Sequence, residues 1–181
     1  MKTLIIQASF PRSASTVLVN AVHGAIPELF SRPVYFSDFS GLQPIPTNQN
    51  IIVIKTHETQ IDDLSLMFAD KYKLYFICSE RAAQNKKFPE KYRYYPNVVI
   101  FDFDELNTTS ANVAHNVYRK MKYILTQVSL NQSLCLRRLE AMNRRYEQIK
   151  SMPFDYVDPY FNIHGSHRSR PVTKNLRHGG Y

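Results

Sequence analysis

The sequence has only two cysteines, and neither belongs to a recognisable pair. Cys78 lies in an apolar run and Cys135 in a helical pattern, and neither has the spacing of a metal site or a CxxC motif. We therefore expect two reduced thiols in a protein core, which favours a reducing compartment.

Long apolar runs are also absent. No stretch approaches the ~18 apolar residues that a membrane-spanning helix needs. The first apolar run, "TLIIQA", is too short for a signal peptide and leads directly into "FPRSAST", residues 10–16. We expect a cytoplasmic protein without a membrane span.

Acidic side chains are fewer than basic ones. There are 15 Asp and Glu against 23 Lys and Arg, which gives a formal net charge of +8. This excess favours an anionic partner, such as a nucleotide, a nucleic acid, an acidic glycan or a membrane surface, although a soluble basic protein without such a partner is an equal alternative. The hydrophobic content of 44% over 181 residues is typical of one folded domain with a real core.

Four nearly continuous apolar runs predict β-strands that are buried on both faces. They cover residues 3–9, 50–56, 73–79 and 97–103. Apolar residues at helical spacing predict four helices. These cover residues 15–26, 61–72, 109–128 and 131–150. Strands that alternate with helices predict an α/β fold, with a parallel sheet flanked by helices.

We expect one domain over residues 1–152. Residues 153–181 lose the periodicity and are rich in proline, histidine and basic side chains. They are expected to form an irregular basic tail that is either disordered or closes over an anionic ligand. In parallel sheets ligands bind beyond the carboxyl ends of the strands, so the functional residues are sought there.

The turn after the first strand, "FPRSAST", has no glycine. The usual triphosphate-binding loop needs G-x-x-x-x-G-K-[ST], so this turn is not one. A helix that starts near Ser15 directs backbone N–H groups toward the turn, while Ser13 and Thr16 add hydroxyls and Arg12 adds a full charge. These groups suit a phosphate or a sulfate, and an ordinary capped helix after a Pro-containing turn is an equal alternative.

The second predicted strand ends in "KTH", residues 55–57. On an extended chain Lys55 and His57 project to the same side. A histidine in this place can take a proton from a hydroxyl, and a lysine beside it can stabilise negative charge on a leaving group. A polar strand end that faces water is the plainer interpretation of these three residues alone.

Five segments in order along the chain resemble one enzyme family. They are "FPRSAST" (10–16), "KTH" (55–57), "YFICSER" (75–81), "VVIFDFDEL" (98–106) and "NLRHGG" (175–180). They are similar to five elements of sulfotransferases, in the same order. The first three are the loop that binds the 5′-phosphosulfate, the Lys-Thr-His motif, and the strand that ends in the arginine that binds the 3′-phosphate. The last two are a Tyr-Glu-Asp-Leu-like element and a late Arg-Lys-Gly loop. The chain thus resembles a compact, divergent member of that family.

The resemblance implies a nucleotide-kinase-like (P-loop NTPase-like) sulfotransferase fold. It also implies a reaction without a metal, in which the sulfuryl group of 3′-phosphoadenosine 5′-phosphosulfate (PAPS) moves to a hydroxyl or amine acceptor. By position, His57 would be the general base, and Lys55 and Arg12 would stabilise the transferring group. The cofactor would be bound by Arg12, Ser13, Ala14, Ser15, Thr16, Arg81, Arg177, His178 and Gly179.

Two departures from the family pattern matter chemically. Ala14 replaces the loop glycine, and alanine resists a backbone with φ > 0. Pro89 lies where the family has a second 3′-phosphate ligand, a serine. The residues that could substitute for it are Ser79, Asn85, Lys86 and Lys87.

Three other functions stay open. They are a nucleotide or small-molecule kinase on the same fold, a non-enzymatic nucleotide or nucleic-acid binder, and a family member that binds nucleotide without turnover. A nucleic-acid partner is not expected.

Overall fold

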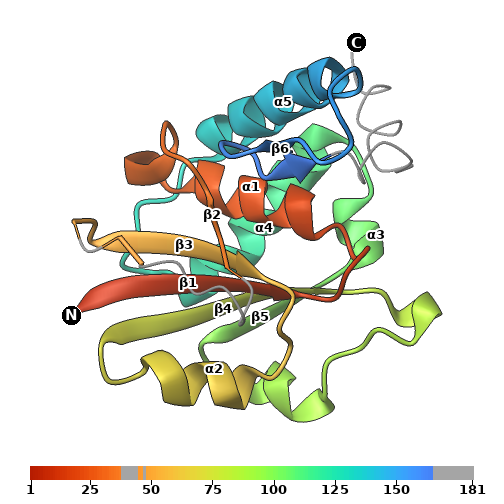
Figure 1. The fold of residues 1–181 in the computed structure, drawn as a ribbon. Coiled ribbons are helices and arrows are strands. Elements are labelled where there is room, and N and C mark those ends of the chain that lie inside the picture. Colours follow the sequence, from red (N-terminus) through yellow and green to blue (C-terminus); the bar gives the residue numbers. More distant parts are fainter. Residues whose placement is uncertain (38–44, 47, 165–181) are drawn as a thin grey trace.

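A parallel five-stranded sheet forms the centre of the computed structural model, which describes residues 1–37, 45–46 and 48–164 (Figure 1). Its strands are β1 (Lys2–Ser9), β2 (Tyr35–Phe36), β3 (Ile51–Thr56), β4 (Tyr72–Glu80) and β5 (Val98–Asp102). The order in the sheet is β2-β3-β1-β4-β5, with every neighbouring pair parallel. The predicted α/β class and parallel sheet are confirmed.

Helices cover both faces of the sheet (Figure 1). One face packs against α1 (Ser15–Ala25) and α4 (Ser110–Ile124), and α5 (Gln132–Ile149) packs on the outer side of these two helices. The other face packs against α2 (Ile61–Phe68) and the 3₁₀ turn η4 (Glu90–Tyr94). Short elements complete the chain: the 3₁₀ turns η1 (Pro27–Leu29) and η3 (Ala82–Gln84), helix α3 (Phe103–Leu106), and strands β6 (Val157–Asp158) and β7 (Ile163–His164).

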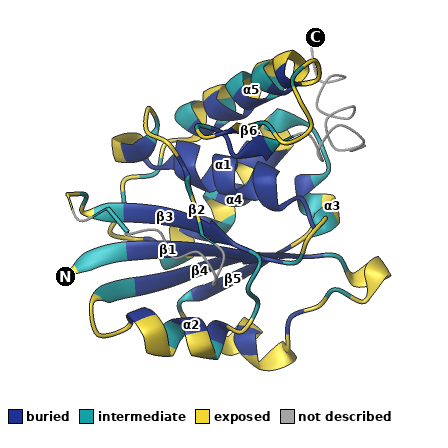
Figure 2. Ribbon diagram, viewed as in Figure 1, coloured by how far each residue is buried: buried dark blue, intermediate teal, exposed yellow. Residues whose placement is uncertain are grey.

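The central strands are buried on both faces, as their continuous apolar sequence predicts (Figure 2). In β1, Leu4 and Ile6 belong to the core under α2, whereas Ile5 belongs to the core under α1. Cys78 and Cys135 are buried and unpaired with each other, and burial raises the pKa of both thiols. Both are thus inert packing groups.

Helix α1 is buried along its whole length between the sheet and α5. The two helices approach closely at Gly24, where a Cβ atom would lie 2.7 Å from Cβ of Arg138 and 3.2 Å from Cα of Cys135. This close approach explains why a glycine stands inside a helix here. The N-caps of α4 and α5 are Thr109 and Asn131, whose side chains accept bonds from the backbone N–H groups three residues on.

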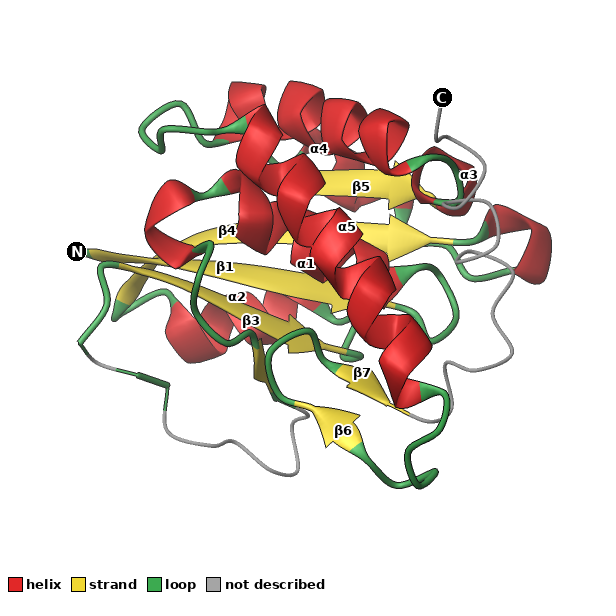
Figure 3. Cartoon of the chain, turned by 90° about the horizontal axis from the view of Figure 1, so that it is seen from above, coloured by secondary structure: helices red, strands yellow, loops and turns green. Residues whose placement is uncertain are grey.

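A short hairpin, β6 and β7, lies over the α1 face where the sequence predicted an irregular tail (Figure 3). Its turn is organised by Asp158, whose Oδ1 accepts bonds from the backbone N–H groups of Tyr160 and Phe161, both at 3.0 Å. Residues 165–181 lie outside the described part of the chain. Within the described part no helix is both long enough and apolar enough to cross a bilayer.

Candidate functional site

The sheet has one topological switch point, between β1 and β4. After β1 the chain leads through α1 to β2 at one edge of the sheet, and after β4 it leads to β5 at the other edge. Loops that diverge in this way leave a crevice beyond the carboxyl ends of the two strands, which is where α/β proteins bind ligands. The two loops at this point are residues 10–14 and 81–86.

The turn after β1 has an unusual backbone. Arg12 has φ 67°, and Ala14, the N-cap of α1, has φ 61° and ψ 26°. Ser13 closes the turn, because its backbone N–H donates to the Phe10 carbonyl at 3.3 Å and its Oγ donates to the same carbonyl at 2.6 Å. Left-handed residues in such a turn direct backbone N–H groups into a concavity that suits an anion, next to the positive end of the helix dipole.

Three serines form a buried hydrogen-bonded cluster beneath this turn. Ser79, near the end of β4, contacts Ser13 Oγ at 2.9 Å and donates from its Oγ to Ser9 Oγ at 2.7 Å. Its backbone N–H also donates to Ser9 Oγ at 3.0 Å. The cluster fixes the turn to both β1 and β4, so Ser79 supports the turn from below.

Ser15 contributes a hydroxyl that the fold itself does not use. The side chain is fully buried in the first turn of α1, and its Oγ has no hydrogen-bond partner among the described residues. Buried hydroxyls normally have a partner, so an orphaned one at a helix N-terminus is the feature expected where a ligand supplies the missing bond.

Lys55 and His57, at the end of β3, both reach the β1–α1 turn. Lys55 is buried and its Nζ donates to Thr16 Oγ1 at 3.0 Å. Nδ1 of His57 lies 2.9 Å from the Ser9 carbonyl oxygen. Because a carbonyl oxygen only accepts, Nδ1 carries the proton in this bond, and the lone pair of the neutral ring is on Nε2. This is the tautomer that a general base needs.

Phe36 is part of this site, although no pattern in the sequence predicts it. The His57 ring packs edge-on against the Phe36 ring, with centroids 6.1 Å apart, and Lys55 Nζ lies 5.7 Å from the Phe36 centroid. Phe36 belongs to the two-residue strand β2, whose register pairs it with Lys55. A strand this short leaves no periodic pattern to detect.

The second loop brings Lys86 to the turn. Backbone bonds between Arg81 and Lys86 fold this loop back on itself, and Lys86 Nζ then donates to the Pro11 carbonyl at 2.9 Å. The guanidinium of Arg81 stacks on Phe103, with Cζ 4.0 Å from the ring centroid. Of the residues considered as substitutes for the missing serine, Ser79 lies beneath the turn, and Lys86 contacts its outer side.

The structure therefore brings together Ser13, Ser15, Thr16, Lys55 and His57. Arg12 is exposed at the tip of the same turn, and Ala14 keeps the left-handed backbone that alanine was expected to resist. The joint role of Arg12 and Arg81 in binding a nucleotide stays a prediction. Arg177, His178 and Gly179 lie outside the described residues.

The carboxylates of Asp102 and Glu105, at the end of β5 and in α3, stabilise the local fold. Asp102 and Glu105 form a reciprocal capping box at α3. Glu105 also pairs with Lys120 of α4, at 2.6 Å. Among residues 1–37, 45–46 and 48–164 there is no cluster of three or more His, Cys, Asp or Glu side chains that could hold a metal ion.

Comparison of the sequence with models of known protein families finds no match. Comparison with curated proteins finds no significant match either. The function is therefore argued from the site alone.

The strained alanine gives a testable prediction. A left-handed alanine costs about 1–2 kcal/mol, which glycine avoids at the expense of some chain entropy, so Ala14→Gly should raise the free energy of unfolding by about 0.5–1 kcal/mol. Urea unfolding measures this change. Ala21→Gly, inside α1, is the matched control and should lower the stability by about 1 kcal/mol. Equal losses in both variants would show that Ala14 carries no strain.

Proposed function

We propose that the protein transfers a sulfuryl group from PAPS to a hydroxyl or amine acceptor. The observation that carries the proposal is the convergence of Lys55 and His57 on the β1–α1 turn, through Thr16 and Ser9. This turn has the backbone and the helix N-terminus of an anion site, and the nearby side chains include a cation and a base.

The groups at the turn fit a phosphosulfate. Residues 10–16 contain no carboxylate, and they offer the hydroxyls of Ser15 and Thr16, the guanidinium of Arg12 and the first N–H groups of α1. Lys86 adds a second cation at the outer side of the turn. The hydroxyl of Ser15 has no partner among the described residues, and a bound oxyanion could accept its hydrogen bond. This hydroxyl therefore favours an oxyanion as the ligand.

Each residue then has a chemical role. His57 Nε2 takes the proton of the acceptor hydroxyl, while Nδ1 stays bonded to the Ser9 carbonyl, which keeps the ring oriented. The acceptor oxygen forms the new bond to sulfur as the bond from sulfur to the donor phosphate breaks, and the electron pair leaves with adenosine 3′,5′-bisphosphate. Lys55 and Arg12 stabilise the negative charge that develops there, as fixed cations do in phosphoryl transfer.

Binding of the product nucleotide tests the proposal. A ligand that binds only the folded state adds about 2.7 kcal/mol of stability at one hundred times its Kd, which for a chain of this length is a rise in Tm of about 5–10 °C. Adenosine 3′,5′-bisphosphate should give such a shift without metal, and Arg12→Ala should lose most of it. Arg144→Ala, which removes an exposed arginine of α5, should keep it.

The alternative outcomes are distinct. A shift with magnesium and ATP, and none with adenosine 3′,5′-bisphosphate, would contradict the proposal and favour a kinase. Salt-sensitive binding of oligonucleotides that is unchanged in His57→Ala would favour a nucleic-acid binder.

A further inference from the structure

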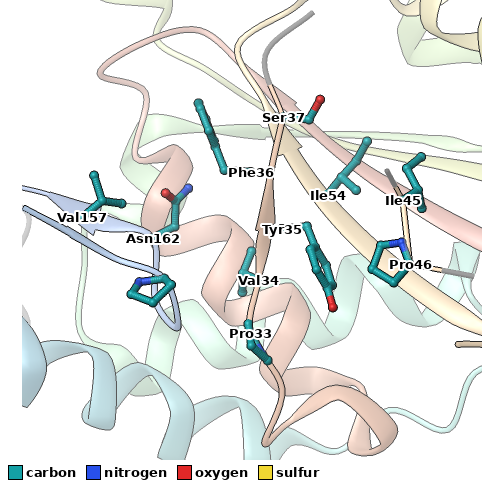
Figure 4. Close-up of a pocket in the computed structure, with 11 residues that line it drawn as sticks. Pro33, Val34, Tyr35, Phe36, Ser37, Ile45, Pro46, Ile54, Val157 and Asn162 are labelled. Atoms are coloured by element: carbon teal, nitrogen blue, oxygen red, sulfur yellow. The ribbon is translucent and has the colours of Figure 1, made fainter. Parts of the chain in front are cut away.

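A cavity of about 310 Å³ lies at the edge of the sheet, between β2 and the β6–β7 hairpin (Figure 4). Its wall is mostly apolar and includes Val34, Phe36, Ile54, Val157 and Pro159. None of the described side chains that line it carries a charge at neutral pH, although the chain as a whole has a net charge of +8. Its size and lining are those of a small-molecule site.

The ring of Phe36 lies between the cavity and the two proposed catalytic residues, Lys55 and His57. This ring lines the cavity and also contacts the His57 ring and the Lys55 ammonium. Lys55 and His57 are not among the described residues that line the cavity, so a molecule held in it must extend past the Phe36 ring to reach them.

Asn162 supplies a polar anchor in the same wall. In Figure 4 its amide stands beside Phe36. The side chain is only 5% exposed, and its Nδ2 has no hydrogen-bond partner among the described residues. A buried amide donor without a partner is costly, so this group favours a ligand that brings an oxygen atom to it.

The hairpin side of the cavity is held by polar contacts that are buried or partly buried. Arg145 pairs with Asp158, Asn20 of α1 donates to the Phe161 carbonyl at 2.7 Å, and Arg138 of α5 donates to the Tyr160 carbonyl at 2.8 Å. These anchors come from two helices, so the wall is rigid before any ligand binds, which lowers the cost of binding.

We propose that this cavity is the acceptor pocket, and that the acceptor is an uncharged phenol or alcohol with an apolar body. This assignment rests on the proposed function. The apolar body packs against Val34, Val157 and Pro159, Asn162 Nδ2 donates to an oxygen of the molecule, and the reacting hydroxyl extends past Phe36 toward His57. An acidic glycan or a sulfated sugar, which the net charge alone would favour, does not suit an uncharged apolar wall.

Calorimetric titration with 2-naphthol, without nucleotide, tests the pocket directly. Val157 is a half-exposed residue of the wall, so Val157→Trp narrows the cavity with little risk to the core, and it should weaken 2-naphthol binding at least tenfold. Leu66→Trp, on the exposed side of α2, adds the same ring elsewhere and should leave the affinity unchanged.

Two further titrations examine the chemistry of the wall. Asn162→Gly accepts the positive φ of 53° at this position and removes the amide, so it should weaken binding about fivefold, as expected for one hydrogen bond. The carboxylate 6-hydroxy-2-naphthoate should bind at least tenfold more weakly than 2-naphthol. Equal binding of the two phenols would overturn the uncharged-acceptor assignment.

Failure of the pocket and failure of the donor site give different results. If adenosine 3′,5′-bisphosphate raises the Tm but 2-naphthol does not bind, or binds equally to Val157→Trp, the pocket assignment is wrong and the donor site stands. If 2-naphthol binds as expected but the nucleotide gives no shift, the cavity is an alcohol site and the sulfotransferase proposal is wrong.

Discussion

His57→Ala is expected to lower the rate of sulfuryl transfer by about two to four orders of magnitude, the usual contribution of a general base. The substitution removes the Nε2 lone pair that would take the acceptor proton. The proposed nucleotide site, which Arg12, Ser15 and the start of α1 would form, should be spared. The Tm shift with adenosine 3′,5′-bisphosphate should therefore persist. Transfer is measured with radiolabelled PAPS over a panel of phenols, alcohols and amines.

Two controls separate chemistry from structure in this experiment. His57→Asn places an amide N–H near the position of Nδ1, so it can keep the bond to the Ser9 carbonyl while it lacks a base, and it should be as slow as His57→Ala. His115→Ala, which removes an exposed histidine of α4, should transfer at the wild-type rate. Transfer by His57→Ala at a rate near that of the wild type would contradict the assigned role.

Most of the sheet could be predicted because its strands are buried on both faces. The continuous apolar runs predicted the bounds of β1, β3, β4 and β5 to within one or two residues. The exception is β2, where Tyr35 and Phe36 pair with β3 over two residues only. Register with a neighbouring strand, which a local pattern does not encode, makes this segment a strand.

The site residues that were predicted lie in local sequence patterns, whereas those that were missed are positioned by long-range contacts. Carboxyl ends of parallel strands meet at one edge, so "KTH" and "FPRSAST" could be expected to meet, and the contacts of Lys55 with Thr16 and of His57 with Ser9 agree with this. Phe36 and Asn162 enter from β2 and the hairpin. Their positions depend on long-range contacts such as that of Asn20 with the Phe161 carbonyl, for which spacing along the chain gives no signal.

The backbone of Ala14 differs from what the conformational preference of alanine predicts. The sequence predicts resistance to φ > 0, and the structure nevertheless has φ 61° there. Ser13 is held from below by Ser79 and within the turn by Phe10, so the surrounding bonds determine the backbone of the next residue. Such strain persists where neighbouring structure imposes it, and it is concentrated at functional sites.

A second histidine, His23, has a purely structural environment and is expected to make the protein sensitive to acid. It is 1% exposed inside α1, and its Nδ1 has no hydrogen-bond partner among the described residues. Burial and the neighbouring charges of Arg138 and Arg32 together lower the pKa of His23 to about 2, against the effect of a hydrogen bond to the Pro33 carbonyl, which raises it. In the folded protein this ring therefore stays neutral where a free histidine is charged.

The sign of the resulting pH dependence follows from linkage. Below the ordinary histidine pKa of about 6.5 the unfolded chain binds a proton at residue 23, while the folded chain binds none until the pH approaches 2. The free energy of unfolding should thus fall by up to about 1.4 kcal/mol per pH unit in this window, or about 2 kcal/mol between pH 6.5 and 4.5. Above about pH 8 residue 23 contributes no pH dependence, because it is then neutral in both states.

Urea unfolding of the wild type and of His23→Gln at pH 6.5 and 4.5 measures this contribution. Glutamine does not titrate and keeps an N–H donor for the Pro33 carbonyl, so the variant should lose about 2 kcal/mol less than the wild type over this interval. Carboxylates such as Asp62, whose pKa is lowered mainly by its bond to Lys91, titrate alike in both proteins and cancel in the difference. Parallel losses in the two proteins would show that His23 is protonated in the folded state, and that burial does not hold its ring neutral.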